Sequence, residues 1–169
     1  MRQTDRDSEF TEFVLAQRPA LVRMARLLTA GDEAFAEDLV QTALTKLFVA
    51  WPRVRRAGNP VGYARTTLTH GFVDELRRGH RRNETVTDRP LETGVEPEPG
   101  LAGDVLTALR DLGPRQRAVV VLRHWLDLDV SETARLLGCS TGTVKSQNSK
   151  ALHHLREALA PVVTLEELA

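Results

Sequence analysis

The stretch VSETARLLGCSTGTVKSQNSK, from Val130 to Lys150, decides the expected fold. Its first eight residues have the spacing of a short amphipathic helix, and Gly138-Cys139-Ser140 then forms a tight turn. A longer helix is predicted from about Thr141 to Leu159. A short helix, a turn containing glycine and a second helix with a polar start together predict a helix-turn-helix.

The polar start of the second helix carries the candidate DNA-binding side chains of this motif. If Val144 faces the core, its polar neighbours point away and can bond base edges and phosphates in a major groove. These candidates are Thr141, Thr143, Lys145, Ser146, Gln147, Ser149 and Lys150. A soluble helix with a solvated polar face shows the same pattern, so the motif alone leaves both interpretations open.

A segment poor in large apolar residues separates this motif from the rest of the chain. Residues 83–100 are rich in acidic side chains and contain three prolines and two glycines, so we expect a flexible linker. The predicted organisation is a helical module over 1–82, the linker, a second helical module over 101–160 and a short tail over 161–169. No alternating pattern indicates a sheet, so the predicted fold class is all-α, with two small helical domains.

Three runs of helical periodicity make up the first module. The run over 10–28 contains Pro19, which we expect to kink or break the helix. The second helix starts at the N-cap Asp32, and residues 51–58 are predicted to form a basic loop. Asn59-Pro60 then begins the third helix, with a capping side chain followed by proline at the first helical position.

The net charge of the 169 residues is zero, but the charges are segregated along the chain. Residues 51–82 hold eight arginines and two acids, and residues 83–111 hold seven acids and two arginines. Residues 112–160 hold seven basic and four acidic side chains. Two basic blocks separated by an acidic stretch are typical of a protein with a polyanionic partner.

The densest basic cluster closes the third helix and includes Arg77, Arg78 and Arg81. Cations at a helix C-terminus also suit the helix dipole, so a structural role is an alternative. The cluster holds more positive groups than a helix end requires, which favours contact with phosphates.

Several classes of protein find no support in the sequence. The single Cys139 cannot form an internal disulfide, and neither a metal-ligand spacing nor a cofactor or nucleophile motif is present, so we expect no metal, no cofactor and no catalysis. The polar residues 1–9 do not resemble a signal peptide, and no stretch is apolar enough to span a membrane. We therefore expect a cytoplasmic protein.

Several motifs in order resemble those of extracytoplasmic-function (ECF) sigma factors, most closely the actinobacterial SigE type, with only a region-2 and a region-4 domain. Asp38-Leu39-Val40-Gln41 is similar to the polymerase-binding helix of region 2, whose closing pattern is matched by Asn59-Pro60, Tyr63, Asp74, Arg77, Arg78 and Arg81. Residues 112–117 resemble the start of region 4, and residues 143–147 its recognition helix. The resemblance covers residues 10–159.

The resemblance implies specific roles for the two modules. Core RNA polymerase would bind through its clamp coiled coil and flap regions, with the clamp on Asp38, Leu39, Gln41, Thr42 and Leu44. The loop 54–59 would hold a flipped base of the minus-ten element, and the third helix would follow the melted strand. The residues implied in these contacts are Val54, Arg55, Arg56, Asn59, Arg65, His70, Arg77, Arg78 and Arg81. The recognition helix would read the minus-thirty-five element as duplex.

Two questions stay open at this stage. His70 stands where many family members have Asn, and an interfacial histidine or a base contact explains it equally well. An anti-sigma factor is a further candidate partner that the sequence neither requires nor excludes. The alternative to a sigma factor is a stand-alone helix-turn-helix regulator with an N-terminal interaction domain, which should bind duplex DNA without polymerase.

Overall fold

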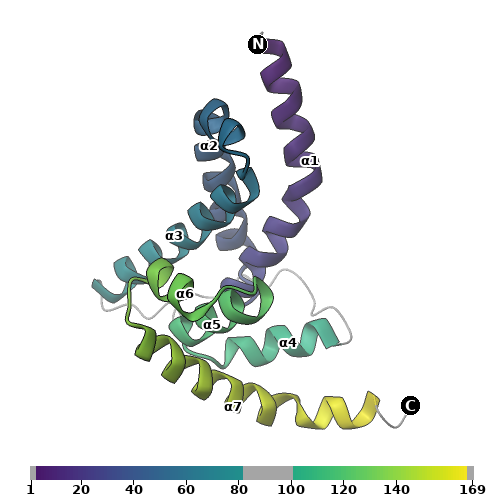
Figure 1. Cartoon of the computed structure of the whole chain (residues 1–169). Helices are drawn as coiled ribbons and strands as arrows, with labels where there is room; N and C mark the ends of the chain where they lie inside the picture. The colour runs from purple at the N-terminus through teal and green to yellow at the C-terminus, as the bar shows by residue number, and fades with distance from the viewer. Residues whose placement is uncertain (1–2, 82–100, 167–169) are drawn as a thin grey trace.

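The computed structural model describes residues 3–81 and 101–166, and every regular element in these ranges is helical. The predicted linker over 83–100 lies outside these ranges. The helices are α1 (Gln3–Leu28), α2 (Glu33–Ala57), α3 (Pro60–Arg81), α4 (Leu101–Arg110), α5 (Pro114–Val120), the π-helical turn Val121–Trp125, α6 (Val130–Leu137) and α7 (Thr141–Glu166). The all-α prediction is confirmed. In Figure 1, α1–α3 form one bundle, and α4–α7 lie together below it.

The ends of the helices follow the capping residues in the sequence. Asp32 accepts a hydrogen bond from the backbone N–H of Phe35 at 3.0 Å, and Asn59 accepts one from Gly62 at 2.9 Å. Both predicted helix starts are confirmed. Asp129 and Glu132 form a reciprocal capping box at the start of α6.

Two predicted interruptions, the break at Pro19 and the loop over 51–58, are absent. A kink at Pro19 stays a prediction. Pro19 lies inside the continuous helix α1, where the carbonyl that loses its donor belongs to Leu15, an exposed residue. The predicted loop 51–58 is helical through Ala57. Trp51 is buried edge-on against Phe10 of α1, with ring centroids 5.1 Å apart, and this packing extends α2 beyond the reach of local signals.

The last helix is also longer than the sequence indicated. We expected it to end near Leu159 and a tail to follow, but α7 continues to Glu166 with Pro161 inside it. The only part of the predicted tail beyond α7 is 167–169, outside the described ranges.

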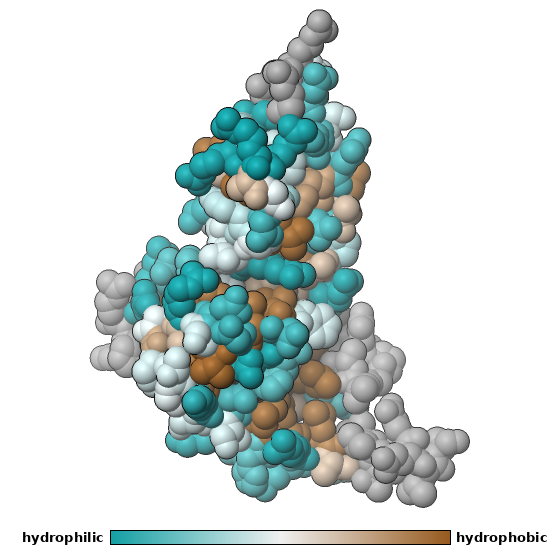
Figure 2. Space-filling model, viewed as in Figure 1, coloured by the Kyte–Doolittle hydropathy of each residue, from teal (hydrophilic) through white to brown (hydrophobic). Residues whose placement is uncertain are grey.

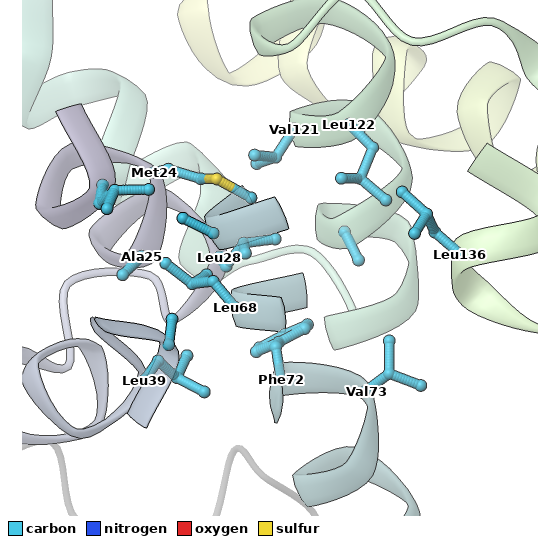
Figure 3. Packing of buried hydrophobic residues seen from close by; sticks show 14 of the residues in the cluster. Met24, Ala25, Leu28, Leu39, Leu68, Phe72, Val73, Val121, Leu122 and Leu136 are labelled. Carbon is cyan, nitrogen blue, oxygen red and sulfur yellow. The ribbon is translucent and has the colours of Figure 1, made fainter. Parts of the chain in front are cut away.

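The two bundles share one hydrophobic core. Met24, Leu28, Leu68 and Phe72 of the first bundle belong to the same buried cluster as Val119, Val121, Leu122, Leu136 and Leu137 of the second. Figure 3 shows Met24 and Val121 pointing into the same space. A smaller cluster of Leu109, Leu112, Val120 and Ala151 holds α4 and α5 against α7. The interface between the bundles is therefore built like a protein interior.

Two arginines of the second bundle bind the carbonyl groups at the end of α1. Buried Arg117 donates to the carbonyl oxygens of Leu28 at 3.1 Å, Leu109 at 2.9 Å and Leu112 at 3.2 Å. Arg110 donates to the carbonyl of Ala30 at 2.9 Å. The end of a helix has carbonyls without intrahelical donors, and its dipole attracts cations. We call this set of contacts, with the shared core, the interdomain seam.

No helix in the described ranges is long and apolar enough to cross a membrane. In the face shown in Figure 2, hydrophobic residues reach the surface mainly in the half that contains α4–α7, among hydrophilic ones.

Candidate nucleic-acid and polymerase interface

The helix-turn-helix has the geometry that its sequence predicts. Gly138 adopts a positive φ of 63° in the turn, and the Ser140 hydroxyl accepts a hydrogen bond from the backbone N–H of Thr143 at 3.1 Å. Val144 is completely buried and fixes the rotation of α7 about its axis. The exposed candidates of the recognition helix are Thr141, Thr143, Lys145, Ser146, Ser149 and Lys150.

Gln147, the remaining candidate of this helix, has a different environment. It is half-buried and lines a cavity of about 20 Å³, together with Thr143 and Cys139. Val73 and Leu76 of α3 line the same cavity. One flank of the recognition helix therefore faces α3 rather than open solvent.

A hollow of about 610 Å³ lies between the C-terminal half of α2 and the start of α3. Its lining residues are Thr45, Lys46, Val49, Ala50, Pro52, Arg53, Arg56 and Tyr63. Lys46 and Arg53 are exposed, Tyr63 is half-buried, and Val49 is 75% exposed. We call it the basic hollow. It combines an aromatic ring with three cations, as surfaces that bind single-stranded nucleic acid do.

The candidate residues predicted around the end of α2 differ in exposure and in hydrogen-bond or ion-pair partners. Arg56 and Asn59 are exposed, and the Nε of Arg56 donates to the carbonyl of Pro52 at 2.9 Å. Arg55 is paired with Glu9 of α1 at 2.6 Å. Val54 is only 6% exposed and packs in the core, so its side chain cannot meet a base, contrary to the expectation for that residue.

The candidates on α3 lie along its exposed side. Arg65, His70, Arg77 and Arg78 are all exposed, and Arg78 lies 3.7 Å from Glu75. Arg77 reaches the turn of the helix-turn-helix, because a Cβ on Gly138 would lie 2.7 Å from its guanidinium. Arg81 ends α3, and its side chain lies outside the described part of the chain.

The predicted polymerase-binding helix presents only part of its candidate set. Asp38, Gln41 and Thr42 are exposed on one side of α2. Leu39 and Leu44 are buried at 6% and 7% exposure, so they stabilise the helix from inside and offer no side chain to a partner. Gln41 donates to Glu37 at 3.3 Å, and Glu37 is paired with Arg18 of α1.

Sequence reasoning did not single out Lys46, Val49 and Arg53 of the basic hollow. The available signal was their spacing on one face of α2, which becomes visible only once residues 51–57 are known to be helical. Among the described residues, no group of His, Cys, Asp and Glu side chains could hold a metal ion.

Two helical modules, one with a helix-turn-helix and one with a basic hollow, define a DNA-binding protein of the transcription machinery. Family comparison agrees with each module in turn. Residues 13–82 match the family model for sigma-70 region 2, and residues 102–155 match the model for sigma-70 region 4.

Relatives with assigned names cover nearly the whole chain. The RNA polymerase sigma-E factor of Streptomyces coelicolor is 36% identical over 154 residues, which are 89% of this chain and 86% of the relative. The ECF RNA polymerase sigma factor ShbA of Streptomyces griseus is 28% identical, with 92% and 90% covered. This chain therefore belongs to the ECF sigma factors, the promoter-recognising subunits that bind core RNA polymerase and direct transcription initiation, and not to the stand-alone regulators.

A solved structure extends the similarity to the arrangement of the fold. It is the sigma factor RpoE in complex with the anti-sigma factor NepR from Bartonella quintana. Its TM-score with this chain is 0.69 at 27% identity, covering 90% of this chain and 97% of RpoE.

Proposed function

We propose that this sigma factor divides its promoter between two surfaces, with the basic hollow and α3 on the melted minus-ten strand and α7 on the minus-thirty-five duplex. The observation that carries this division is the presence of two exposed basic surfaces of different shape on separate modules. A hollow with an aromatic side chain suits unstacked bases, and a protruding helix suits a major groove.

Single-stranded DNA would be held by stacking and charge together. Tyr63 offers a ring at the hollow, and Lys46, Arg53 and Arg56 surround it with cations for phosphates. Arg65 and Arg77 add further exposed positive charges on α3, and His70 is exposed there as well. His70 lies on the exposed side of the helix, which favours contact with the strand over an interior role.

Duplex DNA would be met by the exposed N-terminal part of α7. Lys145 and Lys150 suit phosphates, and the hydroxyls of Thr141, Ser146 and Ser149 suit base edges. All five side chains are exposed, and Ser146 leaves the helix on the side opposite buried Val144.

The polymerase clamp would dock on Asp38, Gln41 and Thr42, the exposed part of the predicted set. The second module would bind the flap.

We also propose that the protein acts in the cytoplasm without catalytic activity of its own. An anti-sigma partner is supported by the likeness to RpoE, which was solved with NepR.

Reconstituted transcription tests this function. Core polymerase with the purified chain should start at defined sites on a genomic DNA library, whereas the chain alone should select no duplex sequence. Tyr63→Leu should reduce the permanganate reactivity of thymines in the melted region, because stacking contributes on the order of 1–3 kcal/mol per base. Arg23→Gln, which changes an exposed side chain on α1, serves as the control. Sequence-specific duplex binding by the isolated chain would instead favour a stand-alone regulator.

A further inference from the structure

A second groove, of about 360 Å³, runs along α7 on the flank opposite the seam. Its lining residues are Arg123, Val130, Val144, Lys145, Asn148, Ser149, Leu152 and Arg156. Thr143 and Gln147 line the cavity against α3, so helical spacing turns Lys145, Ser149 and Arg156 to the other flank. The groove therefore stays open while the two bundles are packed together.

The lining of this groove carries three cations and no acid. Arg123 is held in place, since its guanidinium donates to the carbonyl of Leu128. Its Nε atom is buried and has no hydrogen-bond partner in the described ranges. Asn148 is fixed by a 2.9 Å hydrogen bond between its Oδ1 and the Nε2 of His124. One held cation, Arg123, and two exposed ones, Lys145 and Arg156, in the same groove form a seat for an anion.

The neighbouring carboxylates are engaged elsewhere. Asp129 and Glu132, which flank Val130 in the sequence, bond each other's backbone N–H groups in the capping box. Glu157 lies 3.4 Å from His153 on another side of α7. None of these carboxylates lines the groove, whose charged lining residues are Arg123, Lys145 and Arg156.

The length of the groove suits a chain of anions better than a single one. Lys145, Ser149, Leu152 and Arg156 lie on one stripe of α7, and eleven residues of helix span about 16 Å. Phosphates of one DNA strand follow one another by about 3.4 Å along the helix axis. Lys145 and Arg156, the two cations of this stripe, can meet phosphates several steps apart on one strand, with Leu152 against the sugars between them.

We propose that this groove seats consecutive backbone phosphates of duplex DNA, with Arg123 and Arg156 as positioning residues that read no sequence. The proposal rests on the proposed function, since it places the groove beside the base-reading face of the same helix. It assigns a role to two arginines that neither the helix-turn-helix motif nor the resemblance singled out. The groove is open while the two bundles are packed together. Weak, sequence-independent binding to duplex DNA therefore does not require the bundles to separate.

The test uses the full chain and a fluorescent 20-bp duplex of arbitrary sequence in a salt series. Each phosphate contact contributes about 0.9 to the slope of log K against log salt. Arg156→Gln should therefore reduce the magnitude of that slope by about 0.9, and Arg123→Gln by a similar amount. Arg23→Gln removes the same charge from α1 and should leave the slope unchanged. Arg156 is exposed, so its variant keeps the test valid if Arg123→Gln unfolds.

A second measurement separates this proposal from the proposed function. In holoenzyme transcription, Arg156→Gln should weaken initiation by the same factor on promoters that differ only in the minus-thirty-five sequence. An unchanged slope, or a loss confined to some of these promoters, overturns the phosphate seat while the function stands. Reduced affinity for core polymerase with an unchanged slope also overturns it and identifies an acidic protein segment as the occupant. If the wild-type holoenzyme starts at no defined site, the proposed function itself fails.

Discussion

Arg117 is a buried cation at the seam, where it joins the end of α1 to the second bundle. Among the residues that the structure describes, its guanidinium has three carbonyl partners and no carboxylate, so dipoles offset its charge. Burial lowers its pKa to about 10, because desolvation disfavours the charged form. Below this folded-state pKa the guanidinium is charged, and its burial lowers the free energy of unfolding by the full desolvation cost. That cost decreases only as the pH rises through the folded-state pKa. The seam therefore holds a charged arginine at neutral pH.

Arg117→Leu should lower the free energy of unfolding by on the order of 3 kcal/mol, because three buried carbonyls lose their donor. Urea unfolding followed by circular dichroism measures the change, which should be constant between pH 6 and pH 9 since Arg117 stays protonated there. Arg135→Gln, an exposed arginine on α6, should cost little. Equal effects of the two variants would show that the buried hydrogen bonds are not decisive.

Asp38→Ala and Gln41→Ala should each weaken the binding of core polymerase by on the order of 1–3 kcal/mol and leave the fold intact. Both side chains are exposed on α2, and a polar contact truncated at an interface costs about that much. Competition with the wild-type chain for core enzyme measures the loss. Glu12→Ala on α1 removes an exposed carboxylate as the control. If both variants compete for core enzyme as well as the wild-type chain does, this face of α2 is not the clamp-binding site.

For individual residues, the sequence predicted the chemical type of a binding side chain better than it predicted which residues surround that side chain in the fold. The spacing around Val144 indicated correctly which residues of α7 leave the core of its own module. It could not show that Gln147 meets α3, because that contact joins segments far apart in the sequence. The burial of Leu39, Leu44 and Val54 was missed for a related reason: a motif assigns a role to a segment, and only packing decides which side chains point outward.

Helices were predictable wherever their signals are local. The caps at Asp32 and Asn59 and the turn at Gly138 follow from side chains within three residues of each helix end. The errors at Pro19 and at 51–58 have the opposite origin. Pro52 disfavours a helix over 51–58, but the burial of Trp51 against α1 outweighs that preference. Pro19 removes one donor from α1, which continues through it.

Gly138→Ala should destabilise the helix-turn-helix by on the order of 1–2 kcal/mol. The residue has a φ of 63°, and a Cβ there would lie 2.7 Å from the guanidinium of Arg77. Gly142→Ala is the matched control, because its Cβ meets only the Ser140 hydroxyl at 3.8 Å and its backbone is helical. Urea midpoints should fall for the first variant and stay or rise for the second. A fall for both would place the sensitivity in α7 rather than in the turn.

In the whole molecule the two DNA-binding modules are packed together, whereas the two promoter elements that they bind are far apart on the DNA. The centres of the minus-ten and minus-thirty-five elements are about 25 bp apart, on the order of 85 Å of duplex. A compact chain of this length has a radius of gyration of about 15 Å. The seam must therefore separate before both modules can bind one promoter, and α3 must leave the flank of α7 that carries Gln147.

A chain whose seam is covalently closed should lose promoter-directed initiation. Leu76→Cys places a second thiol on the cavity that Cys139 lines, and a short cleavable reagent with two thiol-reactive ends can join α3 to the turn between α6 and α7. The linked chain should keep its helical circular dichroism and fail to start transcription with core polymerase. Cleaving the linker should restore activity, because the chain is then free to open. Unlinked Leu76→Cys controls for the substitution itself. Full activity of the linked chain would mean that the seam survives in the initiation complex, and that the two modules reach their elements without separating.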